Sequence, residues 1–270
     1  MGETLPGAAL PASSPLTLMT PTTLANSSPV PLAIVLAAGK GTRMFSDLPK
    51  VLVPVRGRPM IRYVIDALHS AGIEKICVVV GYQADLVRRE LANIPGVEFA
   101  LQAEQSGTGH AVMMCRQQLT AHAGPVFVVA GDSPMLQAAT LQSCLAEFRS
   151  QRAACLLGTV EKEDPTGLGR IVRDGEGRFV AIVEEKDATP EQRKLHEINA
   201  STYLFQADDL LQSLEHLTDT NAQREFYITD CPGILLKAGK KVTALKALQP
   251  CEALSINTVD DLKLVEVAME

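Results

Sequence analysis

The stretch Ala33–Lys50, AIVLAAGKGTRMFSDLPK, runs an apolar strand into a loop with two glycines and then places a lysine behind a proline. The next stretch, Met60–Gly72, carries apolar residues three and four positions apart, as an amphipathic helix does. Lys75–Gly81, KICVVVG, is again an apolar, β-branched run. This strand–helix–strand order predicts a βαβ unit.

The alternation of apolar and amphipathic segments continues through the first half of the chain. The segments with this pattern are helical ADLVRREL, strand-like VEFALQ, helical GHAVMMCRQQL and the strand VFVVAGD. They predict an α/β fold with a doubly wound, mostly parallel sheet of the Rossmann type, whose ligands bind beyond the carboxyl ends of the strands. In the second half, GRIVRDGEGRFVAIVEE has the pattern of a hairpin and ASTYLF that of another strand, which predicts a β-rich lobe on the same sheet.

Composition excludes several classes of function. The chain of 270 residues has a net charge of -6, no tryptophan and only 4% aromatic residues. This argues against a general nucleic-acid surface and against base stacking on aromatic side chains. No apolar run reaches the roughly 18 residues of a membrane span. The six cysteines form no CxxC pair, which favours a reducing, cytoplasmic setting.

Five cations gather around the glycine loop against a single carboxylate, Asp47. They are Lys40, Arg43, Lys50, Arg56 and Arg58. A plain strand-to-helix turn would explain the glycines but not this charge, so the loop predicts a bound polyphosphate. The spacing matches neither the P-loop nor the dinucleotide fingerprint, whose third glycine would fall on Met44.

Asp132 follows a second buried strand, in VAGD. A carboxylate at the end of such a strand is costly unless it is paired or binds a metal ion. The residues alone leave helix capping open as the alternative.

Several motifs occur in the order and at about the spacing found in the sugar-1-phosphate nucleotidyltransferases. They most closely resemble the uridyltransferase half of the bacterial bifunctional N-acetylglucosamine-1-phosphate uridyltransferases. The motifs are LAAGKGTRMFSDLPKVL, LQAEQSGTGHAV, VAGDSP, DPTGLGRIVRD, IVEEKDATPEQ, HEIN and FYITD. The resemblance covers residues 31 to 270. The bifunctional proteins continue into a hexapeptide-repeat acetyltransferase, which this chain is not expected to contain.

The resemblance implies a role for each matching residue. Arg43 and Lys50 would be catalytic, and Asp132 and Asn257 would hold Mg²⁺. The nucleotide, UTP, would contact Leu36, Ala37, Ala38, Gly39, Lys40, Gly41, Gln102, Gly107 and Thr108. The sugar would contact Gly169, Glu184 and Asn199. An amide such as Gln102 both donates and accepts hydrogen bonds, which independently suits the imide edge of uracil.

Two departures from the family pattern fall in the sugar segment. Leu168 stands where the family commonly has tyrosine, and Ala200-Ser201 stands where it has Thr-Gly. Residues 1–30, rich in Pro, Ser and Thr, are expected to be a disordered leader. Residues 31–150 are expected to form a nucleotide-binding lobe, 151–257 a sugar-binding lobe and 258–270 a C-terminal helix.

The sequence therefore predicts a cytoplasmic enzyme that transfers a uridylyl group from UTP to a sugar 1-phosphate, with N-acetylglucosamine 1-phosphate as the favoured acceptor. Two alternatives stay open: the same fold acting on another base or sugar, and a non-catalytic nucleotide-sugar sensor. No nucleic-acid or membrane partner is expected, and a homo-oligomer is left open.

Overall fold

The computed structural model describes residues 1–3, 29–44 and 46–270. The predicted leader, 1–30, therefore lies largely outside the described residues. At its end Pro29 is described, and its carbonyl accepts a hydrogen bond of 2.8 Å from Arg149 Nη2. Within the described residues, Pro29, the second-to-last residue of the predicted leader, thus already contacts the domain.

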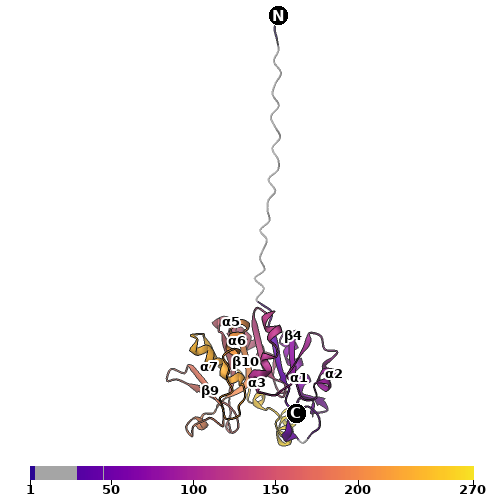
Figure 1. Ribbon diagram of the computed structural model, residues 1–270, viewed down its shortest axis with the longest axis vertical. Helices are drawn as coiled ribbons and strands as arrows, with labels where there is room; N and C mark the ends of the chain where they lie inside the picture. The colour runs from indigo at the N-terminus through magenta and orange to yellow at the C-terminus, as the bar shows by residue number, and fades with distance from the viewer. Residues whose placement is uncertain (4–28, 45) are drawn as a thin grey trace.

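Within the described residues, nine strands form one twisted sheet (Figure 1). Seven lie along its main path in the order β11-β7-β10-β6-β1-β4-β5. In chain order these are β1 (Leu32–Ala37), β4 (Lys75–Val80), β5 (Val97–Leu101), β6 (Pro125–Ala130), β7 (Cys155–Glu161), β10 (Glu197–Gln206) and β11 (Val242–Leu245). The other two, β8 (Arg170–Arg173) and β9 (Phe179–Val183), form the predicted hairpin, which joins β10 through β8.

The sheet is doubly wound and mostly parallel, as predicted. β1 pairs in parallel with β4 on one side and with β6 on the other, whereas β10 runs antiparallel to both β6 and β7. The chain proceeds from β1 outward through β4 and β5 and then returns to β6. The order therefore reverses between β1 and β6, and ligands of such sheets bind at this switch point.

Helices cover both faces of the sheet because successive strand residues point to opposite sides. On β1, Ile34 belongs to one buried core and Val35 to the other. One face packs on α1 (Met60–Ser70), α2 (Ala84–Leu91) and α5 (Ala138–Gln151). The other packs on α3 (Thr108–Met113), α4 (Arg116–Thr120), α6 (Ala207–Leu214) and α7 (Cys231–Lys237).

The helix expected over GHAVMMCRQQL is divided in the structure. α3 ends at Met113 and α4 begins at Arg116. Cys115, with φ −90° and ψ 16°, leaves the helical path between them. Its fully buried side chain packs against the sheet, with its Sγ 3.3 Å from that of Cys77 on β4. The interruption between α3 and α4 thus coincides with the residue whose side chain packs against the sheet.

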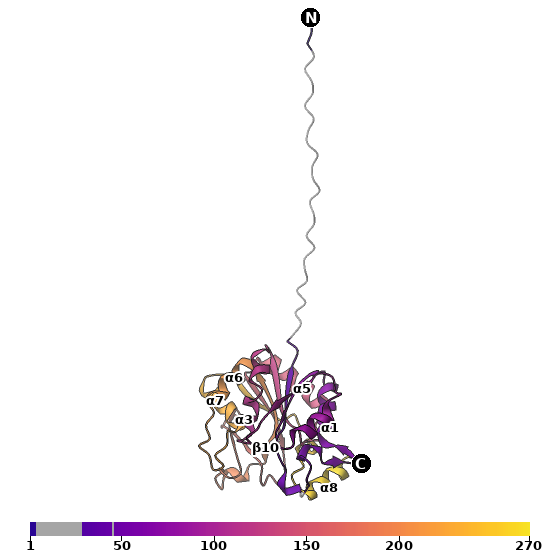
Figure 2. The ribbon, with the colours of Figure 1, turned by 45° about the vertical axis from the view of Figure 1, so that its right-hand side comes forward.

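A small hairpin and the last helix form a separate corner. The hairpin is β2 (Pro54–Val55) and β3 (Arg58–Pro59), and the helix is α8 (Val259–Ala268). Val55, Met60, Ile256 and Val265 share one buried cluster. Figure 2 shows α8 and the C-terminus beside the purple early part of the chain. The end of the chain thus returns to the loop after β1.

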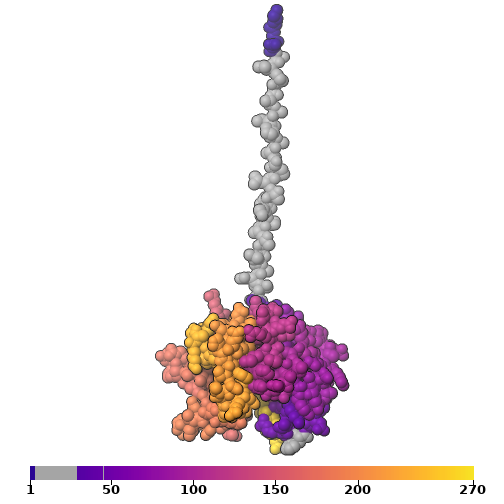
Figure 3. Space-filling view, in the orientation of Figure 1, coloured from indigo at the N-terminus to yellow at the C-terminus, as the bar shows by residue number. Residues whose placement is uncertain are grey.

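Short 3₁₀ helices complete the described elements: η1 (Thr42–Met44), η2 (Lys50–Leu52), η3 (Gln192–Lys194), η4 (Ile228–Asp230) and η5 (Pro250–Ala253). In the part of the chain that is described, none of the helices combines the length and apolar character that a membrane crossing requires. On the visible surface, the orange part of the chain lies to the left of the magenta and purple part, and yellow C-terminal atoms appear at the bottom beside the indigo part (Figure 3).

Candidate functional site

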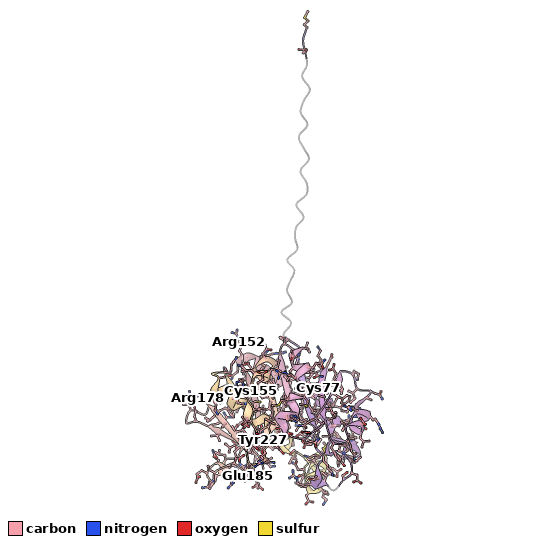
Figure 4. The ribbon with its side chains drawn as sticks, in the orientation of Figure 1. Cys77, Arg152, Cys155, Arg178, Glu185 and Tyr227 are labelled. Carbon is pink, nitrogen blue, oxygen red and sulfur yellow. The ribbon has the colours of Figure 1, made fainter. Side chains whose placement is uncertain are left out.

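A cavity of about 550 Å³ opens at the carboxyl ends of β1 and β6. Its walls come from the loop after β1, the loop after β6, the segment before α3, the hairpin region and the segment before α8. Tyr227, which lines it, lies with Glu185 toward the end of the domain opposite Arg152, the residue that follows α5 (Figure 4). The cavity therefore occupies the switch point at which an α/β sheet binds its ligand.

The predicted site residues converge on this cavity although they are spread over the chain. Those that line it are Leu36, Ala37, Ala38, Gly39, Arg43, Lys50, Gln102, Gly107, Thr108, Asp132, Gly169, Glu184, Asn199 and Asn257. Lys40 and Gly41 are not among the lining residues. The Lys40 ammonium instead lies 5.1 Å from the centre of the Tyr82 ring.

The loop after β1 presents unpaired backbone donors. The carbonyl groups at its start are used, because Leu36 O, near the end of β1, accepts from Gly131 N at 2.9 Å and Ala38 O accepts from Tyr82 N at 3.0 Å. Among the described residues, no backbone N–H from Gly39 to Arg43 has a hydrogen-bond partner. Successive free N–H groups of this kind attract an anion.

Gly41 has a packing role in this loop. Its φ is +69°, a conformation that favours glycine, and a Cβ there would lie 2.6 Å from Lys50 Cβ. The absence of a side chain lets Lys50 pass directly beneath the loop. Gly41, which was predicted to contact the nucleotide, therefore packs against Lys50 and helps to position it.

Lys50 lies at the centre of a polar cluster built from three distant segments. Its ammonium donates to the Asp132 carboxylate and to Asn257 Oδ1, the latter at 2.7 Å. Arg43 Nη2 lies 3.4 Å from the same Asn257 oxygen. The backbone holds the segments together as well, since Ile256 N donates to Asp132 O at 3.2 Å. The two catalytic and two metal-binding residues predicted from the sequence thus form one cluster.

The other cations of the opening stretch have different partners. Arg58 pairs with Asp66 at 2.6 Å, and Arg56 Nη1 donates to Met269 O at 2.9 Å. Arg56 thereby joins the β2–β3 turn to the end of α8. Of the five cations counted in the opening stretch, Arg43 and Lys50 line the cavity. The number of cations in the sequence therefore overstates the positive charge at the cavity.

The donor set suits a hard divalent cation. Within the described residues, no group of three or more His, Cys, Asp or Glu side chains is arranged to hold a metal ion. The Asp132 carboxylate and Asn257 Oδ1 nevertheless converge on one positive group, the Lys50 ammonium. Mg²⁺ commonly takes one or two protein oxygens and completes its shell with phosphates and water. The cluster fits an ion of this kind.

Gln102 also lines the cavity and is only 3% exposed. Its amide nitrogen lies 3.0 Å from Gly107 O, to which it donates, and 3.1 Å from His110 Nδ1. With its nitrogen occupied internally, the side chain has its amide oxygen left to offer a ligand. That oxygen is an acceptor, the complement of the N3–H group of uracil.

The segment after Gln102 is held close to the η4 region. Gly107 has φ +104°, and a Cβ there would lie 2.5 Å from Phe226 O. Gly109 N donates to that same carbonyl at 2.7 Å, and Thr108 Oγ1 accepts from Ile228 N at 3.1 Å. The Thr108 hydroxyl therefore braces this wall and does not cap α3, whose N-cap is Gly107.

The predicted sugar residues meet on the third wall. A Cβ at Gly169 would lie 3.1 Å from Ile182 Cγ2 and 3.4 Å from Glu184 Oε1, so the glycine lies directly against β9 and the Glu184 carboxylate. Burial raises the pKa of Glu184, although a hydrogen bond with Thr229 lowers it. Asn199 N donates to Gly169 O at 2.9 Å, which joins β10 to the loop before β8. Asn199 lies within β10, not in a turn.

Arg170 supports this wall from behind. It is 1% exposed, and it donates to Leu168 O and, at 2.7 Å, to Glu185 Oε2. Glu185 in turn accepts from Gly167 N at 3.2 Å. This charge pair fixes the loop that carries Leu168 and Gly169.

Several lining residues had no role assigned from the sequence: Gln105, Ser133, Ser201, Gln223, Tyr227, Thr229, Glu252 and Ser255. Gln105, Tyr227 and Thr229 fall within the motifs LQAEQSGTGHAV and FYITD, which could have indicated them. Glu252 is buried and accepts from Gln137 N at 2.9 Å and Thr140 Oγ1 at 2.8 Å, at the start of α5. No local pattern links it to that helix.

Comparison with known proteins assigns the chain to a family. A family model described as nucleotidyl transferase matches residues 32–249. The chain belongs to the nucleotidyl transferase family. The matched range includes every predicted site residue except Asn257.

Named relatives make the resemblance closer. The chain is 46% identical over 235 residues to the bifunctional protein GlmU of Pelotomaculum thermopropionicum, covering 87% of this chain and 50% of that one. It is 41% identical over 238 residues to GlmU of Bacillus licheniformis, covering 88% and 52%. This nucleotidyl transferase chain thus spans about half the length of these relatives. The resemblance inferred from the motifs is confirmed.

Solved structures show the same fold at low sequence identity. A putative glucose-1-phosphate thymidylyltransferase from Bacillus anthracis, in complex with sucrose, has a TM-score of 0.69 and 19% identity, covering 88% of this chain and 94% of that one. A UDP-glucose pyrophosphorylase complexed with UDP-glucose has a TM-score of 0.71 and 18% identity, covering 89% and 98%. These likenesses confirm the predicted fold class.

Proposed function

We propose that this nucleotidyl transferase moves the uridylyl group of UTP to a sugar 1-phosphate, with N-acetylglucosamine 1-phosphate as acceptor, and releases pyrophosphate. The observation that carries the proposal is the single cavity in which Gln102, the Lys50 cluster and Glu184 lie on different walls. A base, a chain of phosphates and a sugar require three distinct sets of contacts, and these residues come from separate segments of the chain. The GlmU relatives support the same assignment.

In this proposal, Arg43 and Lys50 carry the chemistry by neutralising charge. The acceptor phosphate oxygen attacks the α-phosphorus in line, and the bond from that phosphorus to the bridging oxygen of pyrophosphate breaks. The attacking oxygen is already anionic, so no protein base is needed. Positive groups fixed before the reaction stabilise the developing charge on the phosphoryl oxygens.

Asp132 and Asn257 are the residues that would hold Mg²⁺. When bound, the ion would neutralise charge shared by the nucleotide and sugar phosphates. In the structure the same two oxygens accept from Lys50. Lys50 would then exchange these partners for phosphate oxygens of the substrate.

We extend the proposal to the division of the chain. Residues 31–150 form the nucleotide-binding lobe, 151–257 the sugar-binding lobe and 258–270 the C-terminal helix that holds Asn257 beside Asp132. The individual contacts of the nucleotide with Leu36 to Gly41, Gly107 and Thr108, and of the sugar with Gly169, Glu184 and Asn199, are part of the same proposal. So is the setting of the reaction in the cytoplasm.

The test is pyrophosphate release from UTP, CTP, dTTP, ATP and GTP, each with a panel of sugar 1-phosphates. UTP with N-acetylglucosamine 1-phosphate should give the highest kcat/KM, and mass spectrometry should show the UDP-sugar. A higher kcat/KM for another pair would identify a different transferase. No pyrophosphate from any pair, with UTP still bound, would favour a nucleotide sensor.

A further inference from the structure

Glu252 is a buried carboxylate in η5, and its hydrogen bonds join two segments that are far apart in the chain. Its side chain reaches the start of α5, where Oε1 accepts from Gln137 N at 2.9 Å and Oε2 accepts from Thr140 Oγ1 at 2.8 Å. Oε2 also accepts from Gln249 N, in the residue before η5, at 2.8 Å. Both carboxylate oxygens are therefore engaged, and the residue is only 3% exposed.

The donors that meet the Glu252 carboxylate are two backbone N–H groups and a hydroxyl, all of them neutral. Gln137 is the N-cap of α5, at the end of a helix that carries partial positive charge. A buried carboxylate is costly unless such donors satisfy it, and its removal would leave them unpaired in turn. Although Glu252 lines the cavity, its oxygens are thus committed to holding η5 against α5.

The segments that Glu252 joins are those that carry the two oxygens assigned to Mg²⁺. Asp132 lies on the loop that leads from β6 into α5, and Asn257 lies on the segment that leads from η5 into α8. Near these residues the segments are joined by the bond from Ile256 N to Asp132 O at 3.2 Å. Glu252 joins them a second time, where the loop enters α5. Two connections restrict a rotation of one segment against the other that a single bond would allow.

The other contacts of Asn257 are local and fix a different quantity. Asn257 N donates to Asp261 Oδ2 at 2.9 Å, and Asn257 Nδ2 donates to Ser255 Oγ at 3.1 Å. These bonds set the direction in which the amide points, but both partners belong to the same segment. The distance between Asn257 and the β6 loop depends instead on Ile256, which is fully buried, and on Glu252.

On the basis of the proposed binding of Mg²⁺ by Asp132 and Asn257, we infer that Glu252 is a positioning residue for this metal site. It acts through the backbone, by holding the segment of Asn257 against the start of α5, and it does not touch the ion or the substrate. Groups that orient metal ligands from behind change metal affinity by about 10- to 100-fold when they are mutated. A looser attachment lets Asn257 Oδ1 move away from Asp132 and so weakens the binding of a divalent cation.

The experiment titrates substrate-free Glu252→Gln and parent protein with Mn²⁺ in place of Mg²⁺ and follows the free ion by electron paramagnetic resonance. In either orientation of the glutamine amide, one of the two backbone N–H groups faces another donor. The Kd for Mn²⁺ should therefore rise by about tenfold. In turnover assays the Mg²⁺ concentration that gives the half-maximal rate should rise similarly, whereas kcat should recover at saturating Mg²⁺.

Two further variants separate positioning from general stability. Leu141→Ala, in the buried core under α5, should lower the melting temperature at least as much as Glu252→Gln but leave the Kd for Mn²⁺ unchanged. Thr140→Val removes only one of the three hydrogen bonds of Glu252, so it should raise this Kd by a smaller factor, about threefold. It replaces Glu252→Gln in the titration if that variant does not fold.

A Kd for Mn²⁺ that is unchanged in Glu252→Gln, or that rises equally in Leu141→Ala, would overturn the inference and leave Glu252 a purely structural residue. A kcat that stays low at saturating Mg²⁺ would also overturn it, because the residue would then act on another part of the site. Asp132→Ala in the same titration shows whether the metal assignment itself has failed. If that variant binds Mn²⁺ as the parent does, the ion lies elsewhere and both proposals are wrong.

Discussion

The ammonium of Lys50 donates to Asn257 Oδ1 at 2.7 Å across 207 positions of the chain, and it donates to Asp132 as well. The side chains of Lys50 and Asp132 are 13% and 20% exposed, so the pair is largely shielded from water. One cation thus satisfies the two oxygens to which we assign Mg²⁺. The lysine and the metal ion are expected to compete for them.

Lys50→Ala should increase the affinity of the substrate-free protein for Mn²⁺, a spectroscopic substitute for Mg²⁺. Loss of a partly shielded ion pair leaves the oxygens of Asp132 and Asn257 available, and an effect of about 1 kcal/mol, or roughly fivefold in Kd, is expected. Electron paramagnetic resonance of free Mn²⁺ during titration measures it. Lys263→Ala, at an exposed pair on α8, controls for the loss of positive charge.

Asp132→Ala should have the opposite effect on the same titration. It removes the charged oxygen and leaves only a neutral amide, so Mn²⁺ binding should weaken by at least tenfold. Equal Mn²⁺ affinity in this variant and the parent would place the metal elsewhere. Full turnover in excess chelator would show that the reaction needs no divalent ion.

Gln102→Ala should reduce the preference for UTP over CTP. The amide oxygen of Gln102 can accept the N3–H of uracil, whereas the corresponding nitrogen of cytosine is itself an acceptor. Loss of this bond should raise the activation free energy for the reaction with UTP by about 1 to 3 kcal/mol and so lower kcat/KM for UTP. The value for CTP should change little. The ratio of kcat/KM values is the readout, because loosening the bond to Gly107 would affect both nucleotides. Equal selectivity in variant and parent would locate base recognition at another residue.

Glu184→Gln should stabilise the protein at neutral pH. Burial raises the pKa of Glu184 in the folded state above its ordinary 4.5, so the folded protein binds this proton more tightly than the unfolded chain does. The resulting stability is present below pH 4.5 and is lost as the pH rises through the folded-state pKa. The neutral glutamine avoids that loss, so the gain over the parent should be larger at pH 7 than at pH 4.

Urea unfolding at the two pH values measures the difference for Glu184→Gln. Glu163→Gln, at an exposed carboxylate, controls for the removal of one negative charge. A gain that is equal at both pH values would mean that Glu184 is not held in an unfavourable, desolvated state. The same variant should bind the sugar 1-phosphate less tightly. In the parent, the Glu184 carboxylate lowers the stability of the folded protein but provides a charged contact for the sugar, and glutamine lacks that charge.

Local patterns carry most of the fold. The apolar run of β1 and the spacing of Ile61, Val64 and Leu68 in α1 specify buried faces by themselves, and these residues are fully buried in the structure. α5 and α7 were not predicted. α7 begins Cys-Pro-Gly, which resembles a turn, and the start of α5 depends on Glu252, more than a hundred residues away. Such long-range partners are invisible to a local pattern.

The site was predicted by resemblance more than by charge. The motifs name residues that the fold does bring to one cavity, whereas the cation count included Arg56 and Arg58, whose partners lie on α8 and α1. β10 contains a bulge at Ala200-Ser201 that depends on how this strand pairs with β7, and pairing register is a tertiary property. The sequence marks Ala200-Ser201 as a departure from the family pattern but does not indicate that the two residues form a bulge.

The most direct test of the account is the single-turnover rate of UDP-sugar formation by Lys50→Ala, measured with saturating UTP and N-acetylglucosamine 1-phosphate beside the dissociation constant for UTP. If Lys50 acts mainly as charge develops toward pyrophosphate, the rate should fall by roughly 10² to 10³, about 2.7 to 4 kcal/mol, while UTP binding changes much less. Lys50→Arg should restore only part of the rate, because a planar guanidinium cannot replace a compact ammonium beneath Gly41. A Lys50→Ala enzyme that binds UTP poorly but turns over at the parent rate when saturated would contradict the account.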